Sequence, residues 1–557
     1  MRTVVVVTAI LAASAPAAAW GGQPWTDEDP AGPPERYELG AVGVRAEAEY
    51  RAQALYINPL SLNTETERRL NLFDHRLRLG GTVDYDETVL LTLSTDWLDG
   101  VLWGDNGQLG LAPEPNSGLN ATTRNPNVTR PCIRYRPSRA DESEAMRLER
   151  QLDPNAYGYA LCEADVVSLR HLYAQVNTPV GALRVGRQAV SQGMGVQTGD
   201  GNGRQNRFGV GGAGDIVDRI MFATKPLEAF KPKAARNSSE HEGLIVAVAY
   251  DKWVSDSVSL FGDDVHQAVV GLQFKQPEFG FGRDLQIVSW YVHRWDSQYA
   301  TRIHTFGLRA HSRFGDFWTG FDVASNLGTT REVSEAYSLL TGDPVVEQPV
   351  RQLGARAVAR YDRPRWGAYL ELDYASGDED PQPGTPLSQF RWSEDNNVGL
   401  LLFEHIVRFQ SARAAAAGVE TVRRLGATTF PPERVDTRGA FTGALAVFPQ
   451  LDVRPHEDVL LRAGVLLAWA PQRLIDPVAT LQAEDGTTIE DDLVNFAGGK
   501  AGSFYGTELD GRFQWRFVDH FSFDLEGAVL FPGDALQDEN GNAVRSVLVQ
   551  GRTTFYY

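Results

Sequence analysis

Arginines and carboxylates spaced by even numbers of residues recur along this chain and could form an anion-binding surface. Residues two apart project from the same face of an extended strand, as Arg76 and Arg78 would. Guanidinium groups stay charged and can hold a carboxylate through two parallel hydrogen bonds. The residues that we expect to line this surface are Arg76, Arg78, Arg184, Arg187, Arg309, Arg313, Arg356, Arg360, Arg462, Arg512, Arg516, Glu508 and Asp510.

The net charge limits what such a surface could bind. The chain has 557 residues and a formal net charge of −19 at pH 7, which does not favour nucleic acid as a partner. Arginines outnumber acids on the predicted strand faces, so a low-dielectric channel lined by these faces would attract small anions or an anionic polysaccharide. The alternative is that arginines and carboxylates of neighbouring strands pair in ladders, which only fill and rigidify a wall.

Motifs for catalysis or for bound metal are incomplete. The segment Gly193–Thr198 fails the dinucleotide-binding pattern, and no histidine pair has the spacing of a zinc site. A hydrolase would need a nucleophile beside a base, for which Ser191 and His293 are the candidates. We therefore expect no enzymatic activity and no cofactor. The acidic loops Asp200–Gly203 and Asp378–Asp380 could hold Ca²⁺ through oxygen ligands, but solvated loops are the commoner outcome.

The elements that position the charged residues are strands. Hydrophobic and polar residues alternate with period two from residue 39 onward. In one segment Phe521, Phe523 and Leu525 share one face, while Asp524 and Glu526 share the other. A soluble sheet seldom carries so many charges on one strand face, whereas a barrel with a lipid side and a wet side does. After residue 19, no apolar run reaches the ~18 residues that a membrane helix needs.

Connections between the predicted strands alternate between long and short. The strands are predicted at 39–57, 70–84, 88–98, 166–177, 181–188, 215–224, 243–252, 265–275, 284–295, 303–313, 317–326, 351–361, 366–376, 437–447, 458–469, 504–516, 521–530 and 545–557. Connections after odd-numbered strands are mostly long, and those after even-numbered strands are mostly short, with 225–242 as an exception. Outer-membrane barrels combine long extracellular loops with short periplasmic turns. The fold class is therefore all-β, a transmembrane antiparallel barrel of about 18 strands (16–18).

Two long loops carry further features. Helical spacing in Leu400–Leu425 predicts a short helix inside loop 377–436, either as a surface cap or as a constriction folded into the lumen. Loop 99–165 holds Cys132 and Cys162, the only cysteines of the chain, which could form a disulfide in an oxidising compartment.

Targeting signals indicate the outer membrane of a Gram-negative bacterium. Residues 1–19 have the charge, short apolar core and Ala17-Ala18-Ala19 ending of a cleavable signal peptide. We expect a flexible periplasmic leader at 20–38 and a single barrel at 39–557. The aromatic Tyr557 ends an alternating strand and resembles the C-terminal signature of outer-membrane proteins. The partners expected from this location are outer-membrane lipids, lipopolysaccharide and the barrel-assembly machinery.

Three scattered segments resemble the alginate-export class of outer-membrane porins, in its broader proteobacterial form. They are Leu183–Gln188 with the glycine-rich loop up to Arg219, Phe390–Glu404, and Tyr505–Asp510 with Leu530–Ala535. The resemblance implies an eighteen-stranded barrel with an electropositive lumen that passes anionic polysaccharide. The long loops 99–165 and 377–436 do not match the family pattern.

Three functions are compatible with the sequence. The first is a porin or channel that favours anions, conducting anionic solutes or exporting an anionic polysaccharide. The second is a closed structural or adhesive barrel that acts through its loops. The third, favoured least, is an outer-membrane barrel hydrolase. Conductance would distinguish the first from the second, and a hydrolysis assay would test the third.

Overall fold

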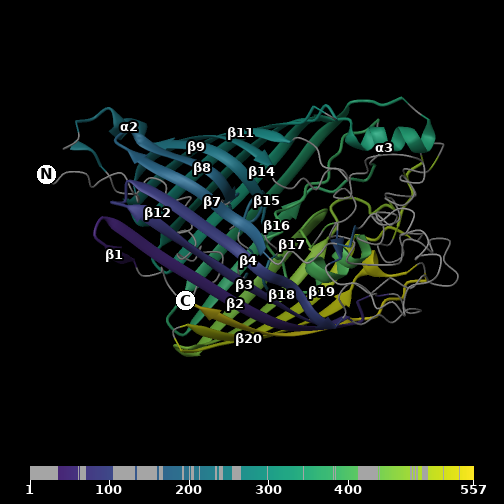
Figure 1. Cartoon of the computed structure of the whole chain (residues 1–557). Coiled ribbons are helices and arrows are strands. Elements are labelled where there is room, and N and C mark those ends of the chain that lie inside the picture. Colours follow the sequence, from purple (N-terminus) through teal and green to yellow (C-terminus); the bar gives the residue numbers. More distant parts are fainter. Residues whose placement is uncertain are drawn as a thin grey trace.

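Eighteen strands close into one antiparallel barrel in the computed structural model, as the sequence predicted (Figure 1). Each barrel strand pairs with the next along the chain, and the last strand, β21, pairs with the first, β2. Closure leaves no open sheet edge, so the backbone groups of the wall are satisfied without water. The structure describes residues 36–60, 62, 70–104, 132–133, 160–161, 167–190, 193–199, 201, 203, 206–211, 214–232, 235–237, 242–253, 265–297, 299–342, 344–380, 382, 384–411, 437, 439–476, 480, 483, 487–491, 500–518, 520–538 and 540–557.

The barrel strands have bounds close to those expected from the alternating pattern. They are β2 (Val42–Asn58), β3 (Leu70–Tyr85), β4 (Val89–Gly104), β7 (Val167–Thr178), β8 (Gly181–Ala189), β9 (Ile216–Thr224), β10 (Gly243–Trp253), β11 (His266–Phe279), β12 (Gly282–Trp295), β13 (Arg302–Phe314), β14 (Phe317–Thr330), β15 (Gln348–Asp362), β16 (Trp366–Ala375), β17 (Ala444–His456), β18 (Val459–Trp469), β19 (Phe504–Val518), β20 (Phe521–Pro532) and β21 (Ser546–Tyr556). Three short strands lie outside the ring: β1 (Tyr37–Leu39), which pairs with β2, and β5 (Cys132–Ile133), which pairs with β6 (Ala160–Leu161).

The fourteenth strand differs from its prediction. It was expected at 437–447, whereas β17 spans Ala444–His456. Pro449 and Pro455 interrupt the residues that would have extended the pattern, since proline removes a ladder donor. The predicted start instead lies inside the lumen, where Phe441 is fully buried. The predicted strand therefore begins and ends nearer the N-terminus than β17 does.

Long and short connections lie at opposite ends of the barrel (Figure 1). The connections at one end have two or three residues, such as those between β11 and β12 or between β15 and β16, apart from the one that contains α2 (Pro226–Ala229). The other end carries longer connections, including the one that contains α3 (Glu332–Thr341). The C-terminus lies at the end with the short turns. By the rule for outer-membrane barrels this end is periplasmic.

The two faces of the wall differ in polarity. On β4, Val89, Leu91 and Leu93 are exposed on the outer face, while Thr92 and Ser94 are buried on the inner face. Outward apolar and inward polar residues are typical of a barrel surrounded by lipid. In the part of the chain that the structure describes, no helix is both long and apolar enough to cross a bilayer.

The ends of the predicted domain scheme fall largely outside the described residues. The predicted signal peptide at 1–19 and nearly all of the leader at 20–38 lie there, so both stay predictions. The last leader residues do have structure. Tyr37 pairs with Val44 through β1, and Arg36 donates to the carboxylate of Asp84 at 2.8 and 3.1 Å.

Candidate functional site

The predicted arginines lie on the inner face of the barrel, with one exception. Arg76, Arg184, Arg309, Arg356, Arg462 and Arg512 are each at most 5% exposed. Arg78, Arg313, Arg360 and Arg516 are half-buried on the same inward faces. Glu508 and Asp510 are buried on β19 beside them. The strands therefore gather these charges in one lumen, as period-two spacing requires.

Arg187 is the exception, and its predicted place in the lumen is wrong. It shares the outer face of β8 with the exposed Leu183 and Val185. Its guanidinium donates to Asp218 at 2.9 and 3.0 Å on the same outer face. The odd-numbered positions of β8 face outward, and Arg187 is three residues from Arg184, so the two side chains project from opposite faces.

Most inward arginines have carboxylate partners on neighbouring strands. Arg78 donates to Asp96 at 2.6 and 2.8 Å, and Arg462 donates to Asp452 at 2.7 and 2.9 Å. Arg356 binds both Glu371 and Asp373, and Arg512 binds Asp524. The ladder of ion pairs, which the sequence left as an alternative, is therefore present. Removing one partner of such a buried pair costs about 3–5 kcal/mol.

The same arginines hold a loop inside the barrel. We call residues 190–215, between β8 and β9, loop L3. Arg76 donates to the carbonyl of Gly203 at 3.2 Å, and Arg356 donates to that of Met194 at 2.5 Å. Arg462 and Arg512 both donate to the carbonyl of Arg207, at 2.7 and 2.9 Å. Because these arginines come from β3, β15, β18 and β19, the loop is held from separate parts of the wall.

Wall carboxylates complete the attachment of loop L3. Asp322 on β14 accepts a hydrogen bond from the backbone N–H of Met194 at 2.7 Å. Glu526 on β20 accepts one from the N–H of Gly209 at 2.8 Å. Hydrogen bonds to charged groups contribute about 1.5–3 kcal/mol each. The charged wall thus fixes the position of the loop through both its donors and its acceptors.

A second loop lies against the first. We call residues 376–443, between β16 and β17, loop L7. Its Asp395 accepts a hydrogen bond from the N–H of Gly201 at 2.5 Å, and its Ser393 N–H donates to Gly195 at 3.2 Å. Glycine makes the close approach possible, because a Cβ at Gly211 would lie 2.2 Å from the carbonyl oxygen of Asp395. The described parts of the two loops therefore lie in direct contact inside the barrel.

The first part of the helix predicted in Leu400–Leu425 lies in the lumen, and residues 412–425 lie outside the described residues. Residues Leu402–Val407 form a π-helical turn in which Phe403 and Ile406 are buried. Phe403 packs edge-to-face on Phe441 and Tyr505, with ring centroids 4.8 and 6.0 Å apart. The wall opposite offers small or aliphatic side chains from β17 to β21 to the same apolar cluster, including Ala444, Ala468, Leu466, Ala528 and Leu548. One side of the lumen is thus filled by an apolar core.

Glu508 fixes the start of this helical turn. Its carboxylate accepts hydrogen bonds from the backbone N–H groups of Leu400, Leu401 and Leu402 at 2.7, 2.8 and 2.6 Å. The first turn of a helix has unsatisfied donors and a partial positive charge, and a carboxylate satisfies both. Glu508, predicted as a residue that faces the solute, instead attaches loop L7 to the wall.

A polar cavity of about 230 Å³ remains on the opposite side of loop L7. Residues 389–394 of loop L7 form one side of it, and inward residues of β12 to β15 form much of the other. Its lining combines three aromatic rings, amides and hydroxyls, two arginines and four carboxylates: Trp253, Phe390, Trp392, Gln197, Asn326, Gln352, Gln389, Thr301, Thr305, Thr330, Ser393, Thr442, Arg294, Arg391, Asp215, Asp296, Glu332 and Glu394. Such a lining suits a polar solute with an apolar face.

The two arginines of the cavity are held in place by neighbours. The guanidinium of Arg294 lies 4.3 Å from the ring centroid of Trp253. Arg391 donates to Glu394 at 2.5 Å. Arg294 also donates to Gln267 at 3.4 Å. Arginine, aromatic rings and open space therefore meet at this cavity.

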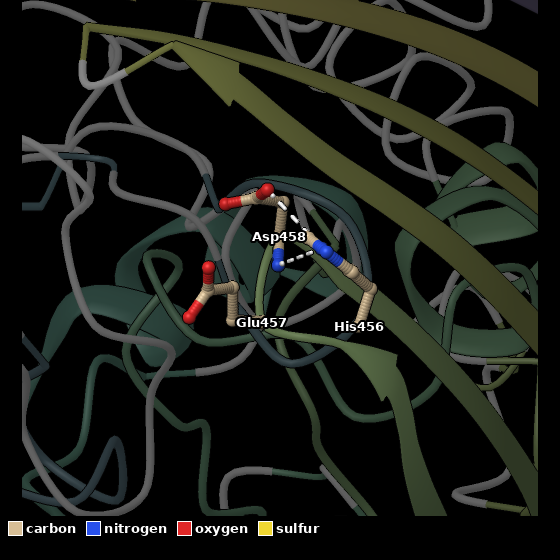
Figure 2. A group of neighbouring side chains, drawn as sticks. All are labelled: His456, Glu457 and Asp458. Atoms are coloured by element: carbon tan, nitrogen blue, oxygen red, sulfur yellow. Dashed lines mark hydrogen bonds and ion pairs between the residues drawn. The ribbon is translucent and has the colours of Figure 1, made fainter.

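Side chains that could bind a metal ion lie in one short turn and in the two acidic loops of the sequence prediction. The exposed side chains of His456, Glu457 and Asp458 gather at the turn between β17 and β18 (Figure 2). There His456 Nδ1 lies 3.2 Å from the Asp458 carboxylate and 3.3 Å from its N–H, so the group closes the turn. Asp378 accepts hydrogen bonds from the N–H groups of Asp380 and Ser388. Asp200 lies outside the described residues, and Ca²⁺ binding stays a prediction.

The predicted disulfide is also left as a prediction. Cys162 lies outside the described residues. Cys132 pairs with Ala160 in the small parallel sheet, which brings two segments within loop 99–165 together.

Several residues of this site escaped the sequence analysis. Arg207 in loop L3 donates to Gln450 and Asp452 and lies over the ring of Tyr369. Asp322 and Asp395, which accept from loop L3, were also missed. The three segments that carry the family resemblance gave the only signal. They contain loop L3, residues 390–404 of loop L7, and the strand ends of β19 and β20, which meet at this site.

Comparison with known proteins gives one family match. The model of the family described as Alginate export matches residues 404–550, which run from loop L7 through β17 to β21. A search of the curated proteins gives no match to this chain.

Solved structures of outer-membrane proteins resemble the chain in fold at low identity. The outer membrane protein opdK from Pseudomonas aeruginosa is 10% identical with a TM-score of 0.44, covering 92% of this chain and 98% of that chain. OccAB1 of Acinetobacter baumannii is 9% identical with a TM-score of 0.46, covering 92% and 96%. The channel DcaP of Acinetobacter baumannii is 9% identical with a TM-score of 0.37, covering 94% and 99%.

The closed barrel, its apolar outer face and the family match lead to one conclusion. The chain is a porin-like β-barrel of the Gram-negative outer membrane, with an alginate export family match over its C-terminal quarter.

Proposed function

We propose that this barrel is a loop-gated channel that prefers anions, with an acidic polysaccharide as its substrate class. The observation that carries the proposal is the polar cavity between loop L7 and the wall. It lies on the inner side of the barrel wall, where a solute that crosses the membrane through the barrel would pass. The match to the Alginate export family favours an acidic polysaccharide over other anions.

The lining of the cavity supports a sugar-like solute. Trp253, Phe390 and Trp392 offer flat apolar surfaces, while Gln352 and Asn326 offer donors and acceptors. A pyranose ring has an apolar face and a hydroxylated edge, and this combination fits both. Arg294, stacked on Trp253, supplies a guanidinium group, and such a group can bind a carboxylate.

The two inward loops supply the gate. Loop L3 is attached to the wall by hydrogen bonds to inward side chains, whereas loop L7 also pairs the backbone of Leu387 with β15. Opening the route would exchange these contacts for contacts with solute or water, and each hydrogen bond to a charged group contributes about 1.5–3 kcal/mol. Movement of the loops would widen the route, while the barrel keeps its own ladder of hydrogen bonds.

Ion selectivity in planar lipid bilayers tests the proposal. Across a salt gradient, the sign of the reversal potential should show preference for Cl⁻ over K⁺. An acidic oligouronate should block the current, whereas a neutral oligosaccharide of equal length should block it far less. Cation selectivity would contradict the proposed preference.

A pair of arginine variants localises the effect. Arg294→Gln removes one guanidinium from the cavity, and block by the oligouronate should weaken about tenfold, the effect of losing roughly 1.4 kcal/mol. Arg363→Gln is the matched control, because Arg363 is exposed at the turn between β15 and β16 and pairs with Asp316. Equal block in both variants would mean that the solute does not bind at this cavity.

A barrel that acts through its loops is the competing function. The apolar core under loop L7 is the observation that favours it, since this core fills one side of the lumen. Deleting residues 412–436 of loop L7 separates the two cases. A changed conductance supports a gate, whereas lost cell adhesion at unchanged conductance supports display.

A further inference from the structure

Seven aromatic and imidazole rings form a continuous stack on the outer face of β10 to β13. In order along the stack they are Tyr250, His266, Trp295, His293, His304, Tyr291 and Phe306. Successive ring centroids lie between 4.6 and 6.0 Å apart. The residues face outward because they share their strand faces with the exposed Val248, Val270, Ile287 and Leu308.

The stack lies at the extracellular ends of its strands. His266 is the first residue of β11, and Trp295 is the last residue of β12. These ends join the longer connections, whereas the short turns lie at the other end of the barrel. The stack is therefore at the height of the outer-leaflet headgroups. Belts of Trp and Tyr occupy this height in membrane proteins. This stack also contains three histidines, which such belts do not explain.

Hydrogen bonds to tyrosine hydroxyls hold two of the imidazoles of the stack. The hydroxyl of Tyr250 lies 2.7 Å from Nδ1 of His266, and that of Tyr291 lies 2.7 Å from Nδ1 of His304. When each phenol donates to Nδ1, the neutral imidazole carries its proton on Nε2. Each ring then presents an N–H donor, and a second proton would add positive charge.

Two cationic side chains border the stack. Lys252 is opposite His266, and Arg302 is opposite Trp295 in the strand register. Both residues are exposed. Below them, toward the periplasm, Val248, Val270 and Leu308 continue the outer face as an apolar surface. The surface therefore combines an apolar lower part with cationic and N–H groups above it.

We propose that this surface binds the phosphate groups of lipid A in the outer leaflet, with the acyl chains on the apolar strands below. Charge complementarity selects this occupant. A phosphorylated glycolipid carries its negative charges at the headgroup level and its apolar chains beneath. Lys252 and Arg302 would bind phosphate as cations, and the histidines would donate from Nε2. A second copy of the barrel would place the same cations opposite one another, which disfavours it.

Native mass spectrometry of the purified protein in detergent tests the proposal, with diphosphoryl lipid A and dephosphorylated lipid A as probes. The wild-type protein should retain diphosphoryl lipid A and bind the dephosphorylated form far less. The triple variant His266→Phe, His293→Phe and His304→Phe keeps the ring area but loses the N–H donors. It should bind diphosphoryl lipid A roughly tenfold more weakly, as should Lys252→Gln with Arg302→Gln.

Controls separate lost binding from lost folding. Each variant should show the same shift on electrophoresis between unheated and boiled samples, which reports a closed barrel. Arg363→Gln removes an exposed arginine beside Tyr361 at the periplasmic end and should bind lipid A like the wild type. Equal binding of the two lipids, or wild-type binding by both stack variants, would overturn the proposal. A changed oligomeric state with unchanged lipid binding would also overturn it and assign the surface to a second copy.

Discussion

At the scale of single residues, glycines allow the two inward loops to approach each other closely. A Cβ at Gly211 would lie 2.2 Å from the carbonyl oxygen of Asp395. We therefore expect Gly211→Ala to push loop L3 away from loop L7 at a cost of about 1–3 kcal/mol. The expected result is a higher single-channel conductance in planar bilayers.

Gly384→Ala is the matched control for this change. Gly384 lies in loop L7, and a Cβ there would have no neighbour within 4 Å. Its conductance should equal that of the wild type. If Gly211→Ala also conducts like the wild type, the contact between the loops does not limit the route.

At the scale of the element, one carboxylate holds the helical turn of loop L7 on the wall. Glu508 accepts three backbone N–H groups at the start of the turn Leu402–Val407. Glu508→Gln removes the charge and keeps one acceptor oxygen. We expect it to weaken the attachment by about 1–3 kcal/mol, since hydrogen bonds to charged groups are the stronger kind. Protease should then cut loop L7 faster, and current recordings should show more frequent openings.

Asp534→Asn is the control at this scale. Asp534 also accepts from two backbone N–H groups, those of Ser503 and Phe504, but it lies exposed in the connection after β20. It should leave cleavage of loop L7 unchanged. Equal cleavage in Glu508→Gln and the wild type would show that the apolar core alone retains the turn.

At the scale of the whole molecule, connection length fixes the orientation in the membrane. Asn540 lies in the connection between β20 and β21, and Glu457 lies in the short turn between β17 and β18. In a background with Cys132→Ser and Cys162→Ser, a membrane-impermeant maleimide should label Asn540→Cys on intact cells. Glu457→Cys should be labelled only after the outer membrane is permeabilised. Labelling of Glu457→Cys on intact cells would reverse the orientation.

Much of the barrel could be predicted from sequence because strand alternation is a local signal. Every inward or outward choice on β4 or β20 is visible in the order of adjacent residues. The exceptions have local causes. Two prolines within β17 interrupt the alternating pattern that would mark its C-terminal end. Arg187 lies three residues from Arg184, and this odd spacing places it on the outer face.

The sequence by itself determined the barrel, the number of its strands, its orientation and the inward face that gathers the arginines. Only the tertiary structure showed that Arg356, Arg462 and Arg512 hold loop L3, that Glu508 holds loop L7, and that a cavity remains beside them. The physical reason is the range of the interactions. Period-two patterning acts between adjacent residues, whereas the path of a loop through a lumen depends on contacts between residues more than a hundred positions apart.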